Sequence, residues 1–477
     1  MIKVIERPNI VLKEINVKFS DNNTSSKIKE VSKDIGRFPF VQIGGQIIEG
    51  TNISFLNLYN DQFLPRIKMR FTDSSGLLLD SLFPLDDSIV KTFIQSSNDN
   101  LNPIRMDFKI TSFIPNKSSG GDNNNVVIDL DGILNVNNLY NSPFNSYNTT
   151  SFSVLKQLAL ESELGFASNI DDTNDKMVWI NPADLNLIFI QDVVKSSFKS
   201  IDTFLYAYVD FYYNLNYVDI ETALNEDIKE QKAFVGNKFM FNEETSKDVV
   251  DQTEKLILNN HPEHIDSNFY INKYNVANTS TAVNLEIGYL YISTYYDSNG
   301  NTIYNLKLDT ISTPGADGKN IIMKGGLGEI SELSRTSCVN DYDGKIDTDN
   351  VHQYFLYANK SNERNLKYLQ KVKMVININS ANFNLYRFQK VLVRMYRINE
   401  FNKNEEIAEQ YKNPSSTSST SDKTIEDEDK MNQRLSGEWL ITSINYNYGD
   451  KTFEQEVTLV RRELTFNNDD YNVNRSY

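Results

Sequence analysis

The residues of this chain best suited to metal or proton chemistry are its three histidines, His261, His264 and His352. His261 and His264 stand three positions apart in the sequence HPEH, whereas two zinc ligands on one helix face stand four apart. Pro262 would also interrupt a helix at this place. We therefore interpret the pair as histidines of a surface linker and predict no metal site.

A second candidate for ion binding is the acidic stretch NDYDGKIDTDN, residues 340–350. If Asp341 is the first position of a calcium loop, the twelfth is His352, where such loops need a bidentate Glu. A solvated acidic turn is the better interpretation, and ion binding by residues 341–352 is left open. The sequence GGLG at 325–328 lacks the Lys of a phosphate loop, so we interpret it as a flexible turn.

The sequence also shows no recognisable residues for nucleophilic catalysis or for glycoside hydrolysis. The chain has no Gly-x-Ser-x-Gly motif, and its many carboxylates offer no pair that the sequence alone could select. The aromatic run from Tyr206 to Tyr217 could stack on sugars, but at this spacing it is more often core. We therefore predict no catalytic residue, no cofactor-binding residue, no cofactor and no enzymatic activity.

Composition narrows the classes of partner. Lys and Arg number 48 against 64 Asp and Glu, a formal net charge of −16. This charge argues against sequence-independent nucleic-acid binding and against binding to anionic membranes. One cysteine, Cys338, excludes an internal disulfide and a cysteine zinc site. The start MIKVIERPNI lacks the apolar core of a signal peptide, and no run of about 20 apolar residues could span a membrane.

The N-terminal part predicts an arm followed by a β domain. Residues 1–37 are polar and weakly patterned, with one short strand expected from 9 to 19. From 38 to 144 short alternating runs follow one another, separated by turn residues such as Gly44-Gly45. Strands at this spacing predict an antiparallel barrel or sandwich.

Residues 145–225 predict a small α+β module. The segment SFSVLKQLALESELG is expected to be a helix with Ser151 as N-cap and Gly165 at the C′ position. Short strands are expected at FASNI and KMVWI. A second helix is expected at 187–196 and a third from near Ile201.

The C-terminal half predicts a linker and a second β domain. Residues 226–265 are charged and poorly periodic, and 266–466 form the second barrel, with a tail at 467–477. Its strands include the runs AVNLEIGYLYISTYY and TIYNLKLDTI, which flank an Asn-Gly turn. Insertions are expected at 312–350 and at 401–433, the latter disordered because of its Ser/Thr-rich and acidic composition. A closing hairpin turns at Gly449-Asp450, with Trp439 expected in the core.

Several of these stretches together resemble one protein family. VQIGGQIIEGTNISFLNLYNDQFLPRIKMRFTD, FPLDDSIVKTFI and PIRMDFKITSF resemble the first tube-like barrel of baseplate hub proteins from T4-type contractile-tailed phages. SFSVLKQLALESELGFASN and SIDTFLYAYVDFYYNLNYVDI are similar to the module between the hub's barrels. NFNLYRFQKVLVRMY and SGEWLITSINYNY with FEQEVTLVRREL resemble strands of the second barrel.

The resemblance implies a fold of two tail-tube-like antiparallel β-barrel domains with a helix-containing insertion domain, mainly β overall. It implies a structural virion protein of the tail baseplate, assembled in the host cytoplasm. Three chains would form a pseudo-hexameric ring that adapts a sixfold tube to a threefold spike and lets DNA pass. The implied partners are two further copies, a separate spike protein, the tail tube protein, and neighbouring baseplate and tape-measure proteins.

Two further expectations concern charge. If the net charge is shared with the bore, the ring should have an acidic lumen that repels DNA; acidity spread over the outer surface is the alternative. Arg461 and Arg462 would then face neighbouring subunits or the tube and pair with carboxylates, so we predict an interface at Arg461, Arg462, Glu454 and Glu456. A tail-associated glycan-binding or glycan-cleaving protein and a tail-tube initiator remain alternative functions.

Overall fold

The structure is a computed structural model. It describes residues 2–10, 39–73, 78, 89–94, 104–117, 126–200, 202–226, 233–236, 268–278, 288–296, 302–308, 313–314, 320–321, 330–338, 352, 354–370, 372–378, 385–395, 432, 435–449 and 452–461. Outside the described residues lie the His261/His264 pair, the acidic loop at 340–350, the Gly-rich turn at 325–328, the tract at 401–431, and Arg462.

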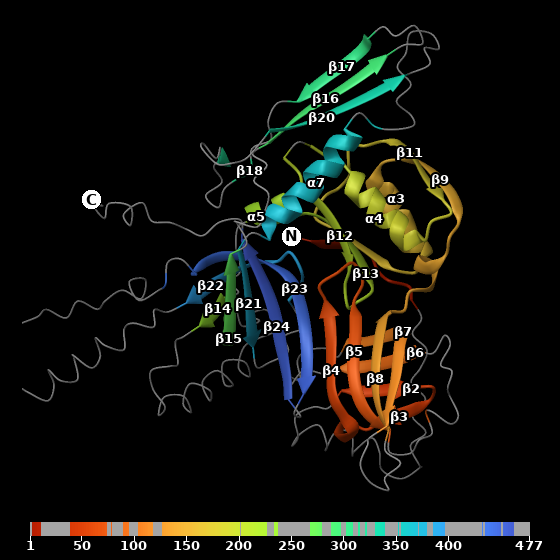
Figure 1. The fold of residues 1–477 in the computed structure, drawn as a ribbon, viewed down its shortest axis with the longest axis vertical. Coiled ribbons are helices and arrows are strands. Elements are labelled where there is room, and N and C mark those ends of the chain that lie inside the picture. Colours follow the sequence, from red (N-terminus) through yellow and green to blue (C-terminus); the bar gives the residue numbers. More distant parts are fainter. Residues whose placement is uncertain are drawn as a thin grey trace, which may run out of the picture.

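The described chain is mainly β with an α+β module, which confirms the predicted fold class. In Figure 1 two β regions lie side by side, the module lies above them, and a further small sheet projects beyond the module. One large sheet runs through both β regions in the order β22-β14-β15-β21-β24-β23-β4-β5-β8-β7-β6-β2-β3.

The first β region is an open, curled sheet in which alternating residues enter the core. Its first hairpin turns at Gly44 and Gly45, both with positive φ, as the Gly-Gly pair predicted. A short 3-10 turn, η1 (Gly50–Asn52), precedes β4. The strands are β2 (Phe40–Ile43), β3 (Gln46–Ile48), β4 (Ile53–Asn60), β5 (Arg66–Asp73), β6 (Ile89–Ile94), β7 (Ile104–Lys117) and β8 (Val126–Leu134).

The second β region closes on itself, because β22 pairs with β14 on one side and with β23 on the other. β14 lies in the segment that we expected to be a linker, and it pairs in parallel with both neighbours. The barrel is therefore not wholly antiparallel. Its strands are β14 (Ala233–Gly236), β15 (Asn268–Asn278), β21 (Val372–Ile378), β22 (Lys390–Met395), β23 (Gly437–Gly449) and β24 (Thr452–Arg461).

The predicted closing hairpin, β23 and β24, joins the two β regions. The first residues of β23, 437–440, pair with β22, whereas residues 444–449 pair with β4 of the first region. A bulge between Ile441 and Ser443 separates the two parts. Trp439 is 1% exposed, so its predicted place in the core is confirmed.

The module is built on a four-stranded sheet in the order β1-β10-β13-β12 and a two-stranded ribbon of β9 and β11. β1 comes from the N-terminal segment that we expected to be an arm. The elements of the module are β1 (Lys3–Glu6), η2 (Asn137–Tyr140), β9 (Phe144–Thr149), α3 (Ser151–Glu161), β10 (Gly165–Ser168), β11 (Met177–Pro182), α4 (Asn186–Ser196), β12 (Leu205–Val209), β13 (Asn214–Asp219) and α5 (Ile220–Asn225).

Details of the module correct three sequence expectations. The cap of α3 is Thr150, whose side chain accepts from Ser153 N, one residue before the predicted cap. Glu163, at φ 59°, follows the end of the helix, and Gly165 starts a strand instead. The helix expected near Ile201 is replaced by β12, because the aromatic residues there alternate at the strand period.

Beyond the module, the runs predicted as part of the second barrel form a separate sheet. β16 (Gly288–Tyr296) pairs with β17 (Thr302–Leu308) as the predicted hairpin, but its other neighbour is β20 (Ile330–Cys338). Two short strands, β18 (Thr313–Pro314) and β19 (Asn320–Ile321), pair with each other. The helix α7 (Phe355–Leu369), absent from our sequence analysis, lies beside α4 (Figure 1).

Candidate functional site

The central part of the large sheet is a band of eight strands, β15-β21-β24-β23-β4-β5-β8-β7. Seven successive pairings, all antiparallel, join them. One unbroken row of paired residues crosses the whole band: Ile271, Ile378, Gln455, Tyr446, Leu58, Ile67, Gly132 and Ile110.

Among the described strands, none covers the outer edge of this band at either end, over equal lengths of eight residues. β6 pairs with β7 only from Ile104 to Lys109, so no described strand covers the outer edge of residues 110–117. β14 pairs with β15 only as far as Tyr270, so no described strand covers the outer edge of residues 271–278. Unpaired strand edges are templates for pairing with another chain.

One face of the band packs into the core and the other carries polar side chains. Lys68 and Arg70 on β5 lie opposite Asp131 and Asp129 on β8. The Arg70 guanidinium donates to Asp129 at 2.6 and 3.0 Å, and this hydrogen bond holds the pKa of Asp129 below its usual range. On these two strands the register thus sets basic residues opposite acidic ones, and Arg70 and Asp129 form an ion pair.

The two β regions and the module meet at Arg387, a buried residue that precedes β22. Its Nε donates to the carbonyl of Thr442, in the bulge of β23, at 2.6 Å. Its Nη1 donates to the carbonyl of Gln62, in the β4–β5 turn, at 2.6 Å. The guanidinium lies 4.5 Å from the ring centroid of Tyr208 in the module. The Arg387 side chain thus contacts both β regions and the module, at the bulge where β23 changes from pairing with β22 to pairing with β4.

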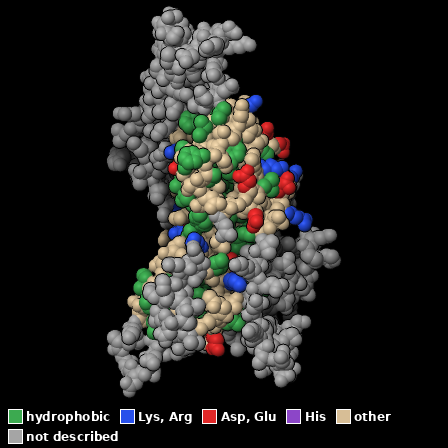
Figure 2. All heavy atoms as spheres, turned by 90° about the vertical axis from the view of Figure 1, so that its right-hand side faces the viewer, with side chains coloured by type: hydrophobic (Ala, Val, Ile, Leu, Met, Phe, Trp, Pro, Cys, Tyr) green, Lys and Arg blue, Asp and Glu red, His purple; other side chains and the backbone are tan. Residues whose placement is uncertain are grey.

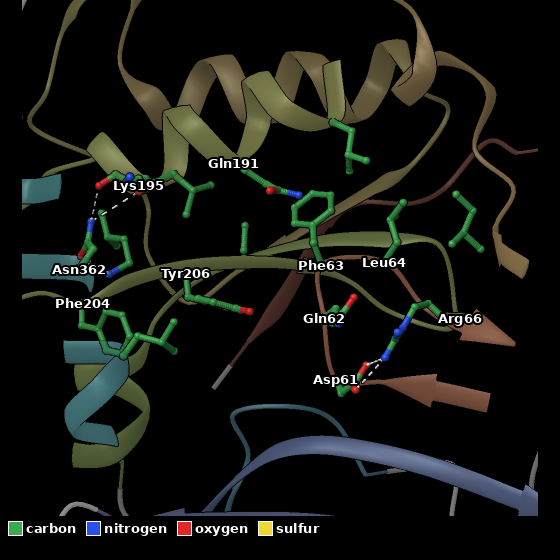
Figure 3. Close-up of a pocket in the computed structure, with 16 residues that line it drawn as sticks. Asp61, Gln62, Phe63, Leu64, Arg66, Gln191, Lys195, Phe204, Tyr206 and Asn362 are labelled. Carbon is green, nitrogen blue, oxygen red and sulfur yellow. Dashed lines mark hydrogen bonds and ion pairs between the residues drawn. The ribbon is translucent and has the colours of Figure 1, made fainter. Parts of the chain in front are cut away.

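A groove of about 620 Å³ opens between α4 and β12, beside the turn from β4 to β5. Its walls are mostly apolar. In Figure 3 Gln191 points from α4 toward Phe63, and the ion pair of Asp61 with Arg66, at 3.0 Å, lies at the opposite side from Lys195. The groove could not be predicted from the sequence, because its residues come from five separated segments of the chain.

Three of the four residues predicted as an interface, Glu454, Glu456 and Arg461, lie on β24. Glu454 and Glu456 are half-buried, and Glu456 accepts from the Asn445 amide at 3.0 Å. Arg461 is 6% exposed in the single chain and its guanidinium lies 4.9 Å from the Trp439 ring centroid. Burial lowers the pKa of Arg461 to about 10, against the influence of Glu438.

The described part of the chain shows neither a cluster of metal ligands nor a membrane-spanning helix. No group of three or more His, Cys, Asp or Glu there could hold a metal ion. His352 is buried, with Nε2 2.9 Å from the Ser196 carbonyl and its ring beside Trp179. None of the helices among these residues has the length and apolarity to cross a bilayer.

The aromatic run of the module is core rather than a sugar platform. Tyr208 is 1% exposed and Tyr217 fully buried, although Tyr212 is exposed. Exposed apolar side chains gather instead on the β9–β11 ribbon, where Phe144 is 83% and Ile180 61% exposed. Figure 2 views this side of the molecule and shows hydrophobic side chains at the surface of the module.

Comparison with known proteins finds similarity in structure alone. No protein-family model and no curated protein matches the sequence. A tail protein from Neisseria meningitidis MC58 has 10% identity and a TM-score of 0.47, over 89% of this chain and 97% of that one. The 43 kDa tail protein of prophage MuSo2 from Shewanella oneidensis has 9% identity and a TM-score of 0.45, over 89% and 99%.

A third structural neighbour is an E. coli component of the type VI secretion system with structural similarity to the T4 bacteriophage tail proteins gp27 and gp5. It has 9% identity and a TM-score of 0.40, over 90% of this chain and 79% of that one. These three neighbours are two tail proteins and a secretion-system component.

Proposed function

We propose that this chain is a structural tail protein, the central hub of a phage baseplate, and that three copies form a ring around a bore. The observation that carries the proposal is the eight-stranded band with two open edges of equal length. The sequence resemblance to baseplate hubs names the same assembly.

The direction of the strands suits closure into a ring. Because seven antiparallel steps separate β15 from β7, the two edge strands run in opposite directions. The free edge of β7 in one copy can therefore pair antiparallel with the free edge of β15 in the next. This is the same kind of pairing that joins β23 to β4 inside one chain.

The register suits closure as well. In one chain Ile110 and Ile271 belong to the same row, and the two free segments extend from this row in opposite senses. If the two free segments pair over their full lengths, the next copy is displaced along the strands by about seven residues. This is the stagger contributed by the eight strands of one copy. A closed barrel requires such a stagger, and an eight-stranded barrel with a shear of eight has strands tilted by about 36°.

The number of copies fixes the size of the bore. Three copies contribute roughly 24 strands, which at about 4.8 Å spacing and this tilt enclose a ring about 45 Å across between backbones. The polar face of the band would line it, with cross-strand ion pairs such as Arg70 with Asp129. Paired charges leave few unbalanced cations to bind passing phosphates. The spike and the tube would then contact opposite ends of the ring.

The test is the mass of the purified assembly. Native mass spectrometry of the full chain should give three times 54.8 kDa, and class averages by electron microscopy should show a ring with a central opening. A stable monomer at micromolar concentration, or a closed dimer, would refute the hub assignment. A six-copy ring of single chains would favour the tail-tube initiator instead.

A further inference from the structure

The edge strand of the module, β12, is open at its centre. β12 is the last strand of the sheet β1-β10-β13-β12, and β13 is its one partner among the strands that the structure describes. On its outer side the N–H of Val209 donates to the Phe63 carbonyl at 2.7 Å, and the N–H of Leu205 donates to the Asn362 side chain at 3.2 Å. Both ends of this edge are therefore occupied.

These two hydrogen bonds show to which side the backbone N–H and C=O of Ala207, midway between Leu205 and Val209, point. Backbone groups alternate sides along a strand, so the N–H and C=O of Ala207 point to the same outer side as those of Leu205 and Val209. No described residue accepts a hydrogen bond from this N–H. Ala207 is nevertheless 4% exposed, and buried backbone N–H groups without a partner are rare in proteins.

The groove described above lies directly along this open edge. Ala207 is part of its wall, facing apolar side chains of α4 such as Leu187 and Val194, while Phe63 and Leu64 contribute from the β4–β5 turn. Figure 3 shows the strand passing below the helix with the groove between them. The volume of about 620 Å³ is within the range of ligand-binding clefts.

We propose that this groove binds an extended peptide segment of another protein by strand addition at Ala207. The guest would exchange two main-chain hydrogen bonds with Ala207, and its side chain at that position would fill the apolar groove. Since both ends of the edge are closed, only about three guest residues can lie within it. This site exists on the single chain, so it does not depend on the ring.

The charges at the rim select the guest. Arg66 is paired with Asp61, whereas Lys195 makes no ion pair among the described residues. An acidic residue next to the central apolar residue of the guest would meet the Lys195 ammonium at the end of α4. The guest is therefore a short apolar–acidic segment in an extended conformation.

Fluorescence anisotropy with labelled pentapeptides tests the proposal. The probes are Ser-Thr-X-Asp-Ser, with Val, Leu, Ile or Phe at X, titrated with the full chain. At least one should bind, and methylating the backbone nitrogen of residue X should weaken it tenfold or more, because a hydrogen bond to Ala207 is lost. Replacing the Asp of the probe by Lys should weaken binding at least threefold.

Variants of the protein give the matched comparison. Ala207→Pro removes the outward N–H and should lower affinity tenfold or more, whereas Ala207→Gly keeps this N–H and should bind the probe more tightly than Ala207→Pro does. Lys195→Gln should remove the preference for Asp over Lys in the probe. If Ala207→Pro does not fold, the N-methyl probe against the unaltered chain decides. Absence of binding by all four probes at 1 mM, or equal binding of the N-methyl probe, would overturn the proposal, whatever the mass of the assembly.

Discussion

At the scale of single residues, two buried arginines packed on aromatic rings support the joins between strands. Arg387 lies on Tyr208 and donates to two backbone carbonyls, and Arg461 lies on Trp439. In each case the guanidinium lies within cation–π distance of an aromatic ring. The partners of Arg387 thus include two backbone carbonyls and a ring, and those of Arg461 include a ring and the Ser436 carbonyl.

Replacing Arg387 tests the join of the three parts. Arg387→Ala leaves the carbonyls of Thr442 and Gln62 without their donor, and each buried, unpaired carbonyl costs about 1–3 kcal/mol. We expect the free energy of unfolding to fall by about 2–5 kcal/mol, measured by urea denaturation. Arg387→Lys keeps the charge but can reach only one carbonyl, so its loss should be smaller. Equal stability of Arg387→Ala and the unaltered chain would contradict this role.

Trp439 gives a second prediction at the same scale. Its ring is buried and its Nε1 donates to the Leu435 carbonyl at 3.0 Å. Trp439→Ala should reduce the free energy of unfolding by about 3–5 kcal/mol, the usual range for a buried aromatic residue. The exposed Tyr212 is the control, and Tyr212→Ala should change stability by less than about 1 kcal/mol. Thermal or urea unfolding of both variants makes the comparison.

At the scale of elements, the large sheet depends on places where strands approach closely. Gly132 of β8 belongs to the row that crosses all eight strands, between Ile67 on β5 and Ile110 on β7. A Cβ added there would lie 2.9 Å from a methyl carbon of Ile67 and 3.0 Å from the Lys109 carbonyl oxygen. A side chain at this position would separate the strands, so the absence of one keeps the row continuous.

Two glycine substitutions in the same sheet test this. Gly132→Ala should reduce the free energy of unfolding by about 1–3 kcal/mol, since it overfills a packed position. At Gly449 of β23 an added Cβ would meet nothing within 4 Å, so Gly449→Ala should be neutral or slightly stabilising. Urea denaturation of the two variants measures the difference. A similar change for both would show that close approach is not what matters at Gly132.

At the scale of the whole molecule, the proposed ring requires one seam between neighbouring copies. Pairing the two free edges over their full lengths sets Ile114 of β7 opposite Tyr274 of β15 in the next copy. Ile114 is 52% exposed in the single chain, and the proposed seam would cover this apolar side chain. Facing residues of two paired strands have their Cβ atoms about 5 Å apart, and the Cβ atoms of a disulfide are about 4 Å apart, so two facing cysteines can be joined.

Paired cysteines test the seam separately from the mass. In a Cys338→Ser background, Ile114→Cys with Tyr274→Cys should give covalent trimers on a non-reducing gel after mild oxidation. Each single variant should stay monomeric on the same gel. Trimers by mass without cross-linking would place the interface elsewhere, and the register of the seam would be wrong while the hub assignment stands.

The sequence by itself determined where most strands lie and which of their faces are buried. Alternation of apolar and polar residues is local, so it identified β4, β5, the β23–β24 hairpin and the burial of Trp439. Helical spacing likewise located α3 and α4. It also identified β16 and β17, but it could not tell to which sheet that hairpin belongs.

The tertiary structure alone decided which strands are neighbours and which edges stay open. The pairing of β23 with β4 joins residues nearly 400 positions apart, and the groove combines five separated segments. Such pairings depend on contacts like those of Arg387, which no local period encodes. A strand's own residues specify its faces, whereas its partner is chosen by the packing of the rest of the chain, and in the proposed ring the two free edges would find their partner in another copy.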